Sequence, residues 1–188
     1  MKIICVLGSP RGIGNSTVIV NKFCEAARKR GAEIQTFNLN LLEFRGCQGC
    51  LACKTNFDRC VLRDELDPVL DGIFEADILV ISSPVYMGGV SGQFKCFIDR
   101  TFSLLNPDFK TSPNPSRLPK GKKALIVTTQ GAPESMFREV PQQLEMMLKR
   151  QGFSEIKTIR GCGISDIGDA ERDEVIMDMA VQAAEQLL

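Results

Sequence analysis

The sequence of 188 residues contains no histidine, no tryptophan and one tyrosine, Tyr86. Without histidine, the chain cannot build a Ser-His-Asp triad, a Cys-His pair or a zinc site with histidine ligands. Lysine plus arginine and aspartate plus glutamate number 23 each, so the charge balance indicates neither a nucleic-acid surface nor attraction to an acidic membrane. No apolar run approaches the length of a membrane-spanning helix. The apolar content of 44% is that of an ordinary globular protein.

Cysteine is abundant by contrast, with eight residues. An apolar strand pattern begins at Lys2 and leaves no room for a signal peptide, so a cytoplasmic location is expected. In such a compartment, cysteines serve metal binding or redox chemistry more often than disulfide bonding. We therefore expect this chain to use its cysteines for metal binding or for redox chemistry.

Apolar runs alternate with helical patterns along the chain. Strands are predicted at 2–7, 33–38, 77–82, 123–129 and 153–160. Helices are predicted at 16–30, 65–75, 93–105, 134–151 and 169–188. Such alternation predicts an α/β fold, and five strands fit the three-layer, doubly wound, parallel flavodoxin-like sheet of order 2-1-3-4-5 better than the six-strand dinucleotide order. We expect one domain over residues 1–188, with a cysteine-rich loop at 47–60 and a proline-rich excursion at 106–121.

A polar loop, Gly8–Thr17, joins the first strand to the first helix. Asn15, Ser16 and Thr17 are residue types that favour a helix N-terminus, so their backbone amides are expected to face the loop. Unpaired amides, the positive end of the helix dipole, hydroxyls and Arg11 together favour a phosphate site over an ordinary turn. The loop lacks the lysine of a P-loop and the spacing of a Gly-x-Gly-x-x-Gly motif, so it suits a single terminal phosphate better than a pyrophosphate.

Two further loops are expected beside this one, because a flavodoxin-like sheet binds its ligand outside the carboxyl ends of strands one and three. The loop at 83–92 carries Pro84, the single tyrosine and a glycine pair that lets the backbone approach a flat ligand closely. The loop at 128–131 offers hydroxyls and amides after the fourth strand. A phosphate cradle beside two loops with few side chains favours a flat, phosphorylated heteroaromatic ligand, and flavin mononucleotide (FMN) is the natural candidate.

The second chemical feature is a run of four cysteines, Cys47, Cys50, Cys53 and Cys60. Three thiolates at intervals of three residues, followed by a fourth, can surround one [4Fe-4S] cluster. Structural zinc usually takes two Cys-x-x-Cys pairs separated by a long loop, so this spacing favours zinc less. The spacing favours cluster ligation and leaves, as the alternative, a cluster-free loop whose thiols are redox-active or only shape the active site.

Three segments of the chain carry a resemblance to a known family. They are Gly8–Arg11 with Asn15–Thr17, then Ser83–Tyr86 with Gly88, Ser91 and Lys95, and then Asp99–Arg100. Through these segments the chain resembles, over its whole length, the flavodoxin-like NAD(P)H-dependent FMN reductases. The cysteine run makes it most similar to the branch of iron-sulfur flavoproteins, whose compact cysteine motif binds a [4Fe-4S] cluster.

The resemblance implies roles for individual residues. The flavin phosphate would be held by Ser9, Arg11, Asn15, Ser16 and Thr17. The isoalloxazine ring would be bordered by Pro84, Val85, Tyr86, Met87 and Gly88, with Thr129 and Gly131 on its other side. Members of the family are homodimers or homotetramers with the flavin near a subunit interface, and the excursion at 106–121 would be a candidate interface or lid.

No side chain is expected to act as an acid, a base or a nucleophile, because hydride acceptance belongs to N5 of the flavin. The donor would be NAD(P)H or a redox protein. The acceptor would be a small molecule or another protein, reached through a [4Fe-4S] cluster or, without one, directly as a quinone, azo compound, nitro compound or free flavin. A non-enzymatic module that senses redox state through its cysteines is a further alternative. A phosphoryl-accepting receiver is excluded, because Gly8 and Ser9 stand where acidic residues are required.

Other charged residues near these segments have ordinary interpretations. Asp64, Glu65 and Asp67 are typical of a helix N-terminus, where they match the dipole. Lys95 and Arg100 follow the second loop and could either contact an anionic cofactor or lie at the surface.

Overall fold

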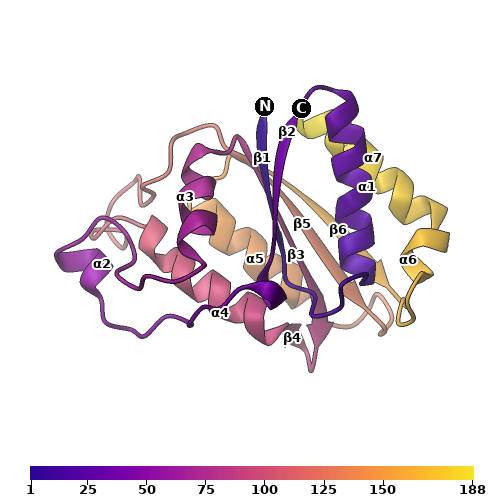
Figure 1. Ribbon diagram of the computed structural model, residues 1–188, viewed down its shortest axis with the longest axis horizontal. Helices are drawn as coiled ribbons and strands as arrows, with labels where there is room; N and C mark the ends of the chain where they lie inside the picture. Colours follow the sequence, from indigo (N-terminus) through magenta and orange to yellow (C-terminus); the bar gives the residue numbers. More distant parts are fainter.

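A parallel sheet runs through the middle of the molecule in the computed structural model, which describes residues 1–188 (Figure 1). Its strands are β1 (Lys2–Leu7), β2 (Glu33–Asn38), β3 (Ile78–Tyr86), β5 (Lys123–Gln130) and β6 (Glu155–Cys162). They lie in the order β2-β1-β3-β5-β6, and every neighbouring pair is parallel. The two-residue β4 (Gly89–Val90) pairs antiparallel with the end of β3. With β4 set aside, this is the predicted order 2-1-3-4-5, so the flavodoxin-like fold is confirmed.

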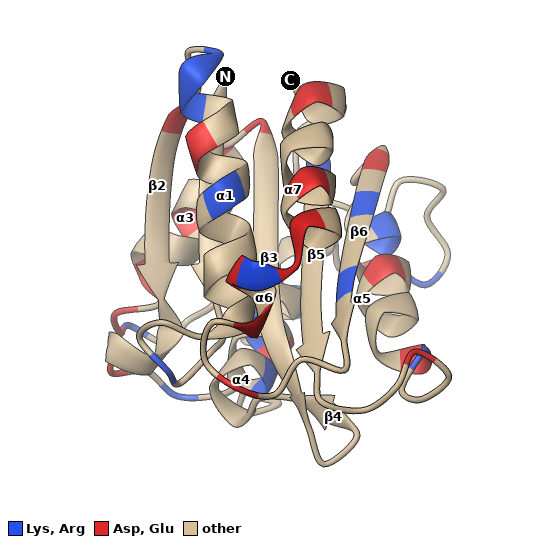
Figure 2. Cartoon of the chain, turned by 90° about the vertical axis from the view of Figure 1, so that its right-hand side faces the viewer, with Lys and Arg blue, Asp and Glu red and all other residues tan.

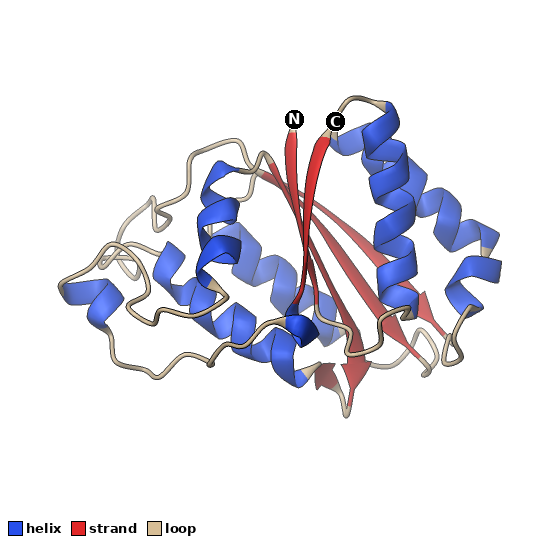
Figure 3. Ribbon diagram, in the orientation of Figure 1, coloured by secondary structure: helices blue, strands red, loops and turns tan.

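Helices cover both faces of the sheet (Figure 3). One face is covered by α1 (Asn15–Lys29), α6 (Asp169–Arg172) and α7 (Glu174–Leu187). The other face is covered by α3 (Asp67–Glu75), α4 (Gly92–Arg100) and α5 (Glu139–Arg150). The short α2 (Ala52–Thr55) lies in the cysteine segment, away from the sheet (Figure 1). Two short 3-10 turns, Leu39–Leu41 and Thr101–Leu104, follow β2 and α4.

Two apolar cores result from the alternation of side chains along the strands. On β1, Ile3 and Cys5 point into the core under α1 and α7, whereas Ile4 and Val6 point into the core under α3, α4 and α5. The same alternation holds for β3 and β5. Strands buried on both faces need continuous apolar runs, and this requirement explains why they could be recognised in the sequence.

Charged side chains are found mostly on the helices and on the edge strand β6, which carries Glu155, Lys157 and Arg160 (Figure 2). The central strand β3 carries none, and its neighbour β5 carries only Lys123 at its first position. None of the helices combines the length and the apolar character needed to cross a membrane.

Four predicted elements differ from the structure by more than two residues. The helix expected at 93–105 ends at Arg100, and the 3-10 turn Thr101–Leu104 follows it. The third strand continues to Tyr86 and turns back through β4, where a loop over 83–92 was expected, because Val85 and Tyr86 pair with Val90 and Gly89. The fourth predicted helix begins at Glu139 instead of residue 134, because the preceding segment is held in a loop. The last predicted helix is divided at Asp173, whose carboxylate accepts a hydrogen bond from the amide of Ile176 and so caps α7.

One junction fixes the first loop against α4. The Ser91 hydroxyl, just before α4, donates to the carbonyl of Gly8 at 2.5 Å, and the Ser91 amide donates to the hydroxyl of Ser83 at 3.0 Å. A Cβ on Gly8 would lie 2.7 Å from the Cβ of Phe94 and 2.8 Å from the carbonyl of Ser82, so no side chain fits there. The ends of β1 and β3 and the start of α4 therefore form one tightly packed unit.

Phe23 tests the packing that holds α1 on the sheet. Its side chain is completely buried in the core shared by α1, α7 and the sheet. Phe23→Ala should lower the free energy of unfolding by about 3–5 kcal/mol, because the lost apolar contact leaves a cavity. Urea denaturation of the flavin-free protein would measure this change. Val175→Ala, at an exposed position of α7, should change it by less than about 0.5 kcal/mol. Equal effects of the two substitutions would contradict this account of the core.

Candidate functional site

A cavity of about 270 Å³ lies at the carboxyl ends of the strands. Its lining residues come from the loops that follow β1, β5 and β6, from the start of α1 and from the last residues of β3 and β5: Ser9, Arg11, Gly14, Asn15, Ser16, Pro84, Val85, Tyr86, Thr129, Gln130, Gly131, Ile164 and Ser165. A larger, open hollow of about 930 Å³ lies between the cysteine segment and α3. Size therefore does not identify the strand-end cavity as the candidate site. The unpaired polar groups that converge on this cavity identify it.

The N-terminus of α1 supplies the first of these groups. The helix begins without a side-chain cap, and its first backbone hydrogen bond is donated by Val18 to Gly14 at 3.0 Å. The amides of Asn15, Ser16 and Thr17 therefore have no acceptor within the protein. A Cβ on Gly14 would lie 2.5 Å from the Ser9 hydroxyl oxygen, so a side chain there would displace this hydroxyl from its place beside the helix end.

The Ser16 hydroxyl is the second unpaired group. Ser16 is 1% exposed, yet its Oγ has no hydrogen-bond partner. A buried hydroxyl without a partner is costly and indicates an acceptor or donor supplied from outside the chain. The Ser9 hydroxyl, also buried, accepts a hydrogen bond from the amide of Arg11 at 3.2 Å and keeps its own proton available. Together with the helix dipole, these groups form an anion site.

The side chain of Asn15 is used differently from the prediction. Its amide nitrogen donates to the carbonyl of Asp166 at 2.9 Å, and its oxygen accepts from the amide of Ala170 at 3.2 Å. Asn15 therefore ties the segment before α6 to the first loop and offers the cavity only its backbone. Thr17 is buried but does not line the cavity, so its contribution is also limited to its amide.

The second loop is a tight hairpin turn between β3 and β4. Met87 and Gly88 have φ values of +48° and +78°, as a two-residue turn with both central residues left-handed requires. Pro84, Val85 and Tyr86 line the cavity, whereas Met87 and Gly88 lie beyond it, and the Met87 side chain is fully exposed. A left-handed methionine is strained, and such strain is often found at functional sites.

The third wall of the cavity is formed by the ends of β5 and β6. Thr129 and Gly131 line it as predicted, and a Cβ on Gly131 would lie 2.2 Å from the Ser165 hydroxyl oxygen. The buried side-chain amide of Gln130 donates to the carbonyls of Ala132, Pro133 and Met136 and so folds the segment before α5 onto the sheet. Arg160 of β6 donates to the Met136 carbonyl at 2.9 Å and reinforces this arrangement.

Two lining residues, Ile164 and Ser165, were missed in the sequence, whereas Gln130 lies in the predicted loop at 128–131. Ile164 and Ser165 follow the final strand in a glycine-containing turn, and the carboxyl-end rule for parallel sheets could have pointed to it. Asp169 holds this turn, because its carboxylate accepts hydrogen bonds from the amides of Ser165 and Asp166, both at 2.8 Å. These bonds from Asp166 and Ser165 lower the pKa of Asp169. Arg11 reaches across to donate to the Ser165 carbonyl at 3.3 Å and closes the cavity's rim.

The four cysteines of the 47–60 run surround a second, smaller cavity. It measures about 90 Å³ and is lined by Cys47, Cys50, Cys53 and Cys60 together with apolar residues and Arg100. Cys47 and Cys50 are exposed, whereas Cys53 and Cys60 are half-buried, and all are free thiols. No three histidine, cysteine, aspartate or glutamate side chains in the structure converge closely enough to hold a single metal ion. The cysteines thus share a cavity without forming a compact one-ion site.

Two cations fasten the outer part of the cysteine segment to the chain after α4. The Lys54 ammonium donates to the carbonyls of Phe102 and Leu105, at 2.6 and 2.5 Å, and lies 4.2 Å from the centre of the Phe102 ring. Arg117 donates to the Cys53 carbonyl at 2.8 Å. Burial raises the pKa of the Cys53 thiol, Lys54 opposes this effect, and the thiolates of Cys60 and Cys47 add to it.

Arg100 and Asp64 have roles that the sequence did not indicate. Arg100 is buried and paired with Asp64, so it is neither a surface residue nor a cofactor contact of the strand-end cavity. Asp64 is therefore more than a charge near a helix N-terminus. Burial lowers the pKa of Arg100, but the Asp64 carboxylate and the Cys60 thiolate outweigh it, so the net shift is upward. Lys95, by contrast, is exposed and pairs with Asp99 at 2.7 Å.

A family model described as NADPH-dependent FMN reductase matches residues 1–158. An iron-sulfur flavoprotein of Methanocaldococcus jannaschii is 40% identical over 104 residues, which cover 55% of this chain and 53% of the relative. An iron-sulfur flavoprotein of Archaeoglobus fulgidus is 28% identical over 174 residues, which cover 91% of this chain and 74% of the relative. The chain thus aligns with about half the length of the first of these relatives. The structure is similar to that of NAD(P)H:quinone oxidoreductase from Methanothermobacter marburgensis, with a TM-score of 0.77 and 16% sequence identity. The match covers 100% of this chain and 96% of the other. At this identity the likeness supports the fold alone.

Asp169 tests whether the turn after β6 matters for binding. Asp169→Asn removes the charged acceptor that holds Ser165, so the affinity for FMN should fall severalfold in a fluorescence titration. Because the pKa of Asp169 is lowered, the carboxylate's contribution is present at neutral pH and disappears only as the pH falls through that pKa. The difference from the wild type should therefore persist from about pH 8 down to about pH 5. Asp173→Asn makes the same change of charge at the α7 cap and keeps an oxygen acceptor there, so it should leave the affinity unchanged. Equal FMN affinity of Asp169→Asn and the wild type would show that the turn is not needed.

Proposed function

The chain belongs to the NADPH-dependent FMN reductase family, and from this premise we propose that it is an FMN-dependent oxidoreductase that takes electrons from NAD(P)H or a redox protein. The observation that carries the proposal is the anion site at the start of α1, where three free amides and the orphaned Ser16 hydroxyl face the strand-end cavity. When bound, FMN would supply the hydride-accepting atom, its N5.

The chain's own residues bind and orient the cofactor. Ser9, Ser16 and the α1 amides would hold the phosphate, and Arg11 at the rim would contribute its positive charge. Pro84, Val85 and Tyr86 would border the ring on one side, and Thr129 and Gly131 on the other. We assign Asn15 and Thr17 a backbone contact only, and we place Met87 and Gly88 at the edge of the ring through the turn they form. No side chain is proposed as an acid, a base or a nucleophile.

We further propose that Cys47, Cys50, Cys53 and Cys60 hold a [4Fe-4S] cluster. The donor set supports this, because four free thiols line one cavity with apolar walls. A cubane spaces its four thiolate ligands farther apart than a single ion does, so the lack of a one-ion site does not disagree with a cluster. The cluster would serve as a one-electron carrier between FMN and a further acceptor, which could be a small molecule or a protein.

A homodimer or homotetramer is also proposed. Large apolar side chains are exposed on the segments at the carboxyl ends of β1, β3, β5 and β6: Ile13, Tyr86, Met87, Met136 and Ile167. Exposed apolar side chains at the same end of the sheet as the cavity support an interface there. The excursion at 106–121 lies elsewhere, beside the cysteine segment, and its role as an interface or lid remains a prediction, as does the cytoplasmic location.

Two alternatives follow from the same structure. If no cluster forms, the exposed rim of the FMN site would let a quinone, an azo compound or free flavin reach the ring directly, as in a cluster-free NAD(P)H-dependent reductase. If neither cofactor binds, the half-buried thiols of Cys53 and Cys60 would suit a non-enzymatic redox sensor.

Purification in the absence of oxygen separates these possibilities. The wild type should show the paired absorption bands of a flavin, a broad shoulder of an iron-sulfur cluster, and about four iron atoms per chain. Cys53→Ser should lose the iron and the shoulder but keep the FMN, because Cys53 does not line the strand-end cavity. Flavin without iron in the wild type would favour the cluster-free reductase. A colourless wild type that stays colourless when FMN is added would contradict the proposed function.

Charge reversal tests the phosphate cradle. Arg11→Glu should weaken FMN binding at least about tenfold, because it replaces attraction to the phosphate by repulsion. Lys29→Glu makes the same change at the far end of α1, about 21 Å away, and should leave binding unchanged. Equilibrium dialysis of flavin against both variants would measure the effect. Retention of FMN by Arg11→Glu would show that the phosphate lies elsewhere.

A further inference from the structure

Arg100 occupies a special position between the two sites. It is the last residue of α4, a helix of nine residues whose start is bound to Gly8 and Ser83 beside the strand-end cavity. Such a helix is about 14 Å long, so its far end reaches the cysteine cavity, which Arg100 lines. The Arg100 side chain is completely buried, and a cation is rarely buried so fully unless an opposite charge is paired with it, as Asp64 is here.

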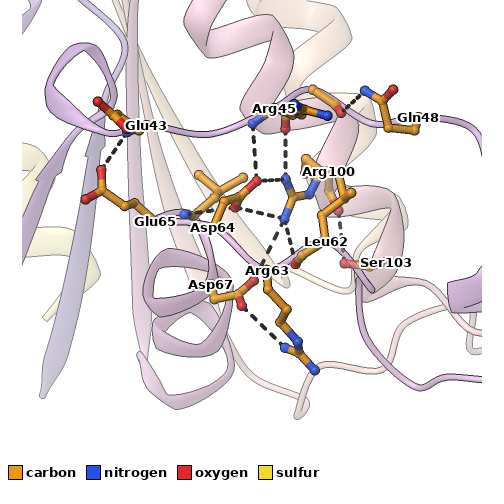
Figure 4. A network of polar contacts seen from close by, with 12 residues as sticks. Glu43, Arg45, Gln48, Leu62, Arg63, Asp64, Glu65, Asp67, Arg100 and Ser103 are labelled. Carbon is orange, nitrogen blue, oxygen red and sulfur yellow. Dashed lines mark hydrogen bonds and ion pairs between the residues drawn. The ribbon is translucent and has the colours of Figure 1, made fainter.

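The guanidinium clamps both stems of the cysteine segment (Figure 4). Its two terminal nitrogens bind the two oxygens of Asp64 at 2.7 and 3.2 Å. One of them also donates to the carbonyl of Arg45, two residues before Cys47, at 2.8 Å. The other donates to the carbonyl of Leu62, two residues after Cys60, at 3.4 Å. Both ends of the cysteine run are thus tied to one planar group.

The remaining donor of this group is unused. The Nε of Arg100 is buried and has no hydrogen-bond partner in the protein. Lys54 and Arg117, two further cations beside the segment, donate to backbone carbonyls instead. A buried N–H of a charged group without an acceptor is costly, so its retention points to an acceptor that enters the cavity. The four cysteines make sulfur the acceptor on offer there.

We propose that Arg100 is the positioning and charge-compensating residue of the cysteine site, and that its Nε–H donates to sulfur of the group which the four cysteines hold. This inference rests on the cluster assignment of the proposed function. Reduction adds one electron to a group that already carries the charge of four thiolates. A guanidinium in a poorly hydrated cavity therefore favours the reduced state and raises the reduction potential, while Asp64 opposes this effect.

The test compares substitutions that loosen the same clamp but change the charge in opposite directions. Arg100→Gln removes the positive charge, and Asp64→Asn removes the negative charge that neutralises it. Arg63→Gln is the matched control, because it removes a cation of the same segment whose side chain is 64% exposed and screened by solvent. Each protein is purified without oxygen. Iron and FMN are counted per chain, and the cluster is titrated with dithionite and followed by electron paramagnetic resonance.

Arg100→Gln should lower the reduction potential of the cluster and raise the rate of iron loss to a chelator about 10- to 100-fold. Asp64→Asn should raise the potential, and Arg63→Gln should leave it unchanged. FMN content should stay constant in all variants, since none of these residues lines the strand-end cavity. A purely structural role would shift the potential of Arg100→Gln and Asp64→Asn in the same direction or not at all, and either result would overturn the inference.

Two further outcomes are decisive. If Arg100→Gln does not fold, Arg100→Lys, which keeps the charge but lacks the guanidinium Nε, should lose iron faster than the wild type, and the upward shift in Asp64→Asn still decides the question of charge. Iron loss from Arg100→Lys at the wild-type rate would overturn the Nε assignment.

An iron-free wild type would refute the cluster of the proposed function and this inference with it, whereas an iron-loaded wild type with unchanged variants would refute this inference alone.

Discussion

The lack of space at Gly8 constrains both sites of this protein. Because no Cβ fits between Phe94 and the Ser82 carbonyl, the end of β1 lies directly against the first turn of α4. The loop that follows Gly8 is thereby placed over the end of β3, where the phosphate cradle and the second loop meet. The same contact sets the direction of α4 and hence the place where Arg100 meets the cysteine segment. One backbone contact therefore positions the strand-end cavity, the proposed flavin site, and the cysteine site relative to each other.

The sheet could be predicted from the sequence because its central strands are buried on both faces. The strands Lys2–Leu7 and Lys123–Gln130 contain the uninterrupted apolar runs 3–7 and 124–127, and their predicted boundaries agree with the structure to within one residue. The errors lie where tertiary contacts override local preference. Residues 134–138 have a helical pattern but are held in a loop, because the side chains of Gln130 and Arg160 both donate to the carbonyl of Met136. Gln130 lies on a strand, and Arg160 is far away in the sequence, so neither contact is visible in the local pattern. The hairpin at Met87 needs a left-handed backbone conformation, which a methionine in the sequence does not predict.

The candidate site was predictable where its signal is local and was missed where it depends on distant segments. Ser9, Arg11 and Ser16 lie in one loop before a helix, and helix-end chemistry identifies them. Ser165 reaches the same cavity from the other end of the chain, and no neighbouring residue marks it. The pairing of Arg100 with Asp64 spans 36 positions, so a helix-end charge was the only local interpretation available for Asp64.

The clamp at the base of the cysteine segment has a consequence for how such proteins diversify. Both stems are fastened next to the cysteine run, by a buried ion pair outside the sheet, and the run itself adds no strand to it. Residues between the stems can then be replaced, shortened or lengthened at little energetic cost to the sheet. A cysteine segment of this kind can in this way be acquired, exchanged or discarded during evolution while the sheet and its strand-end cavity stay intact.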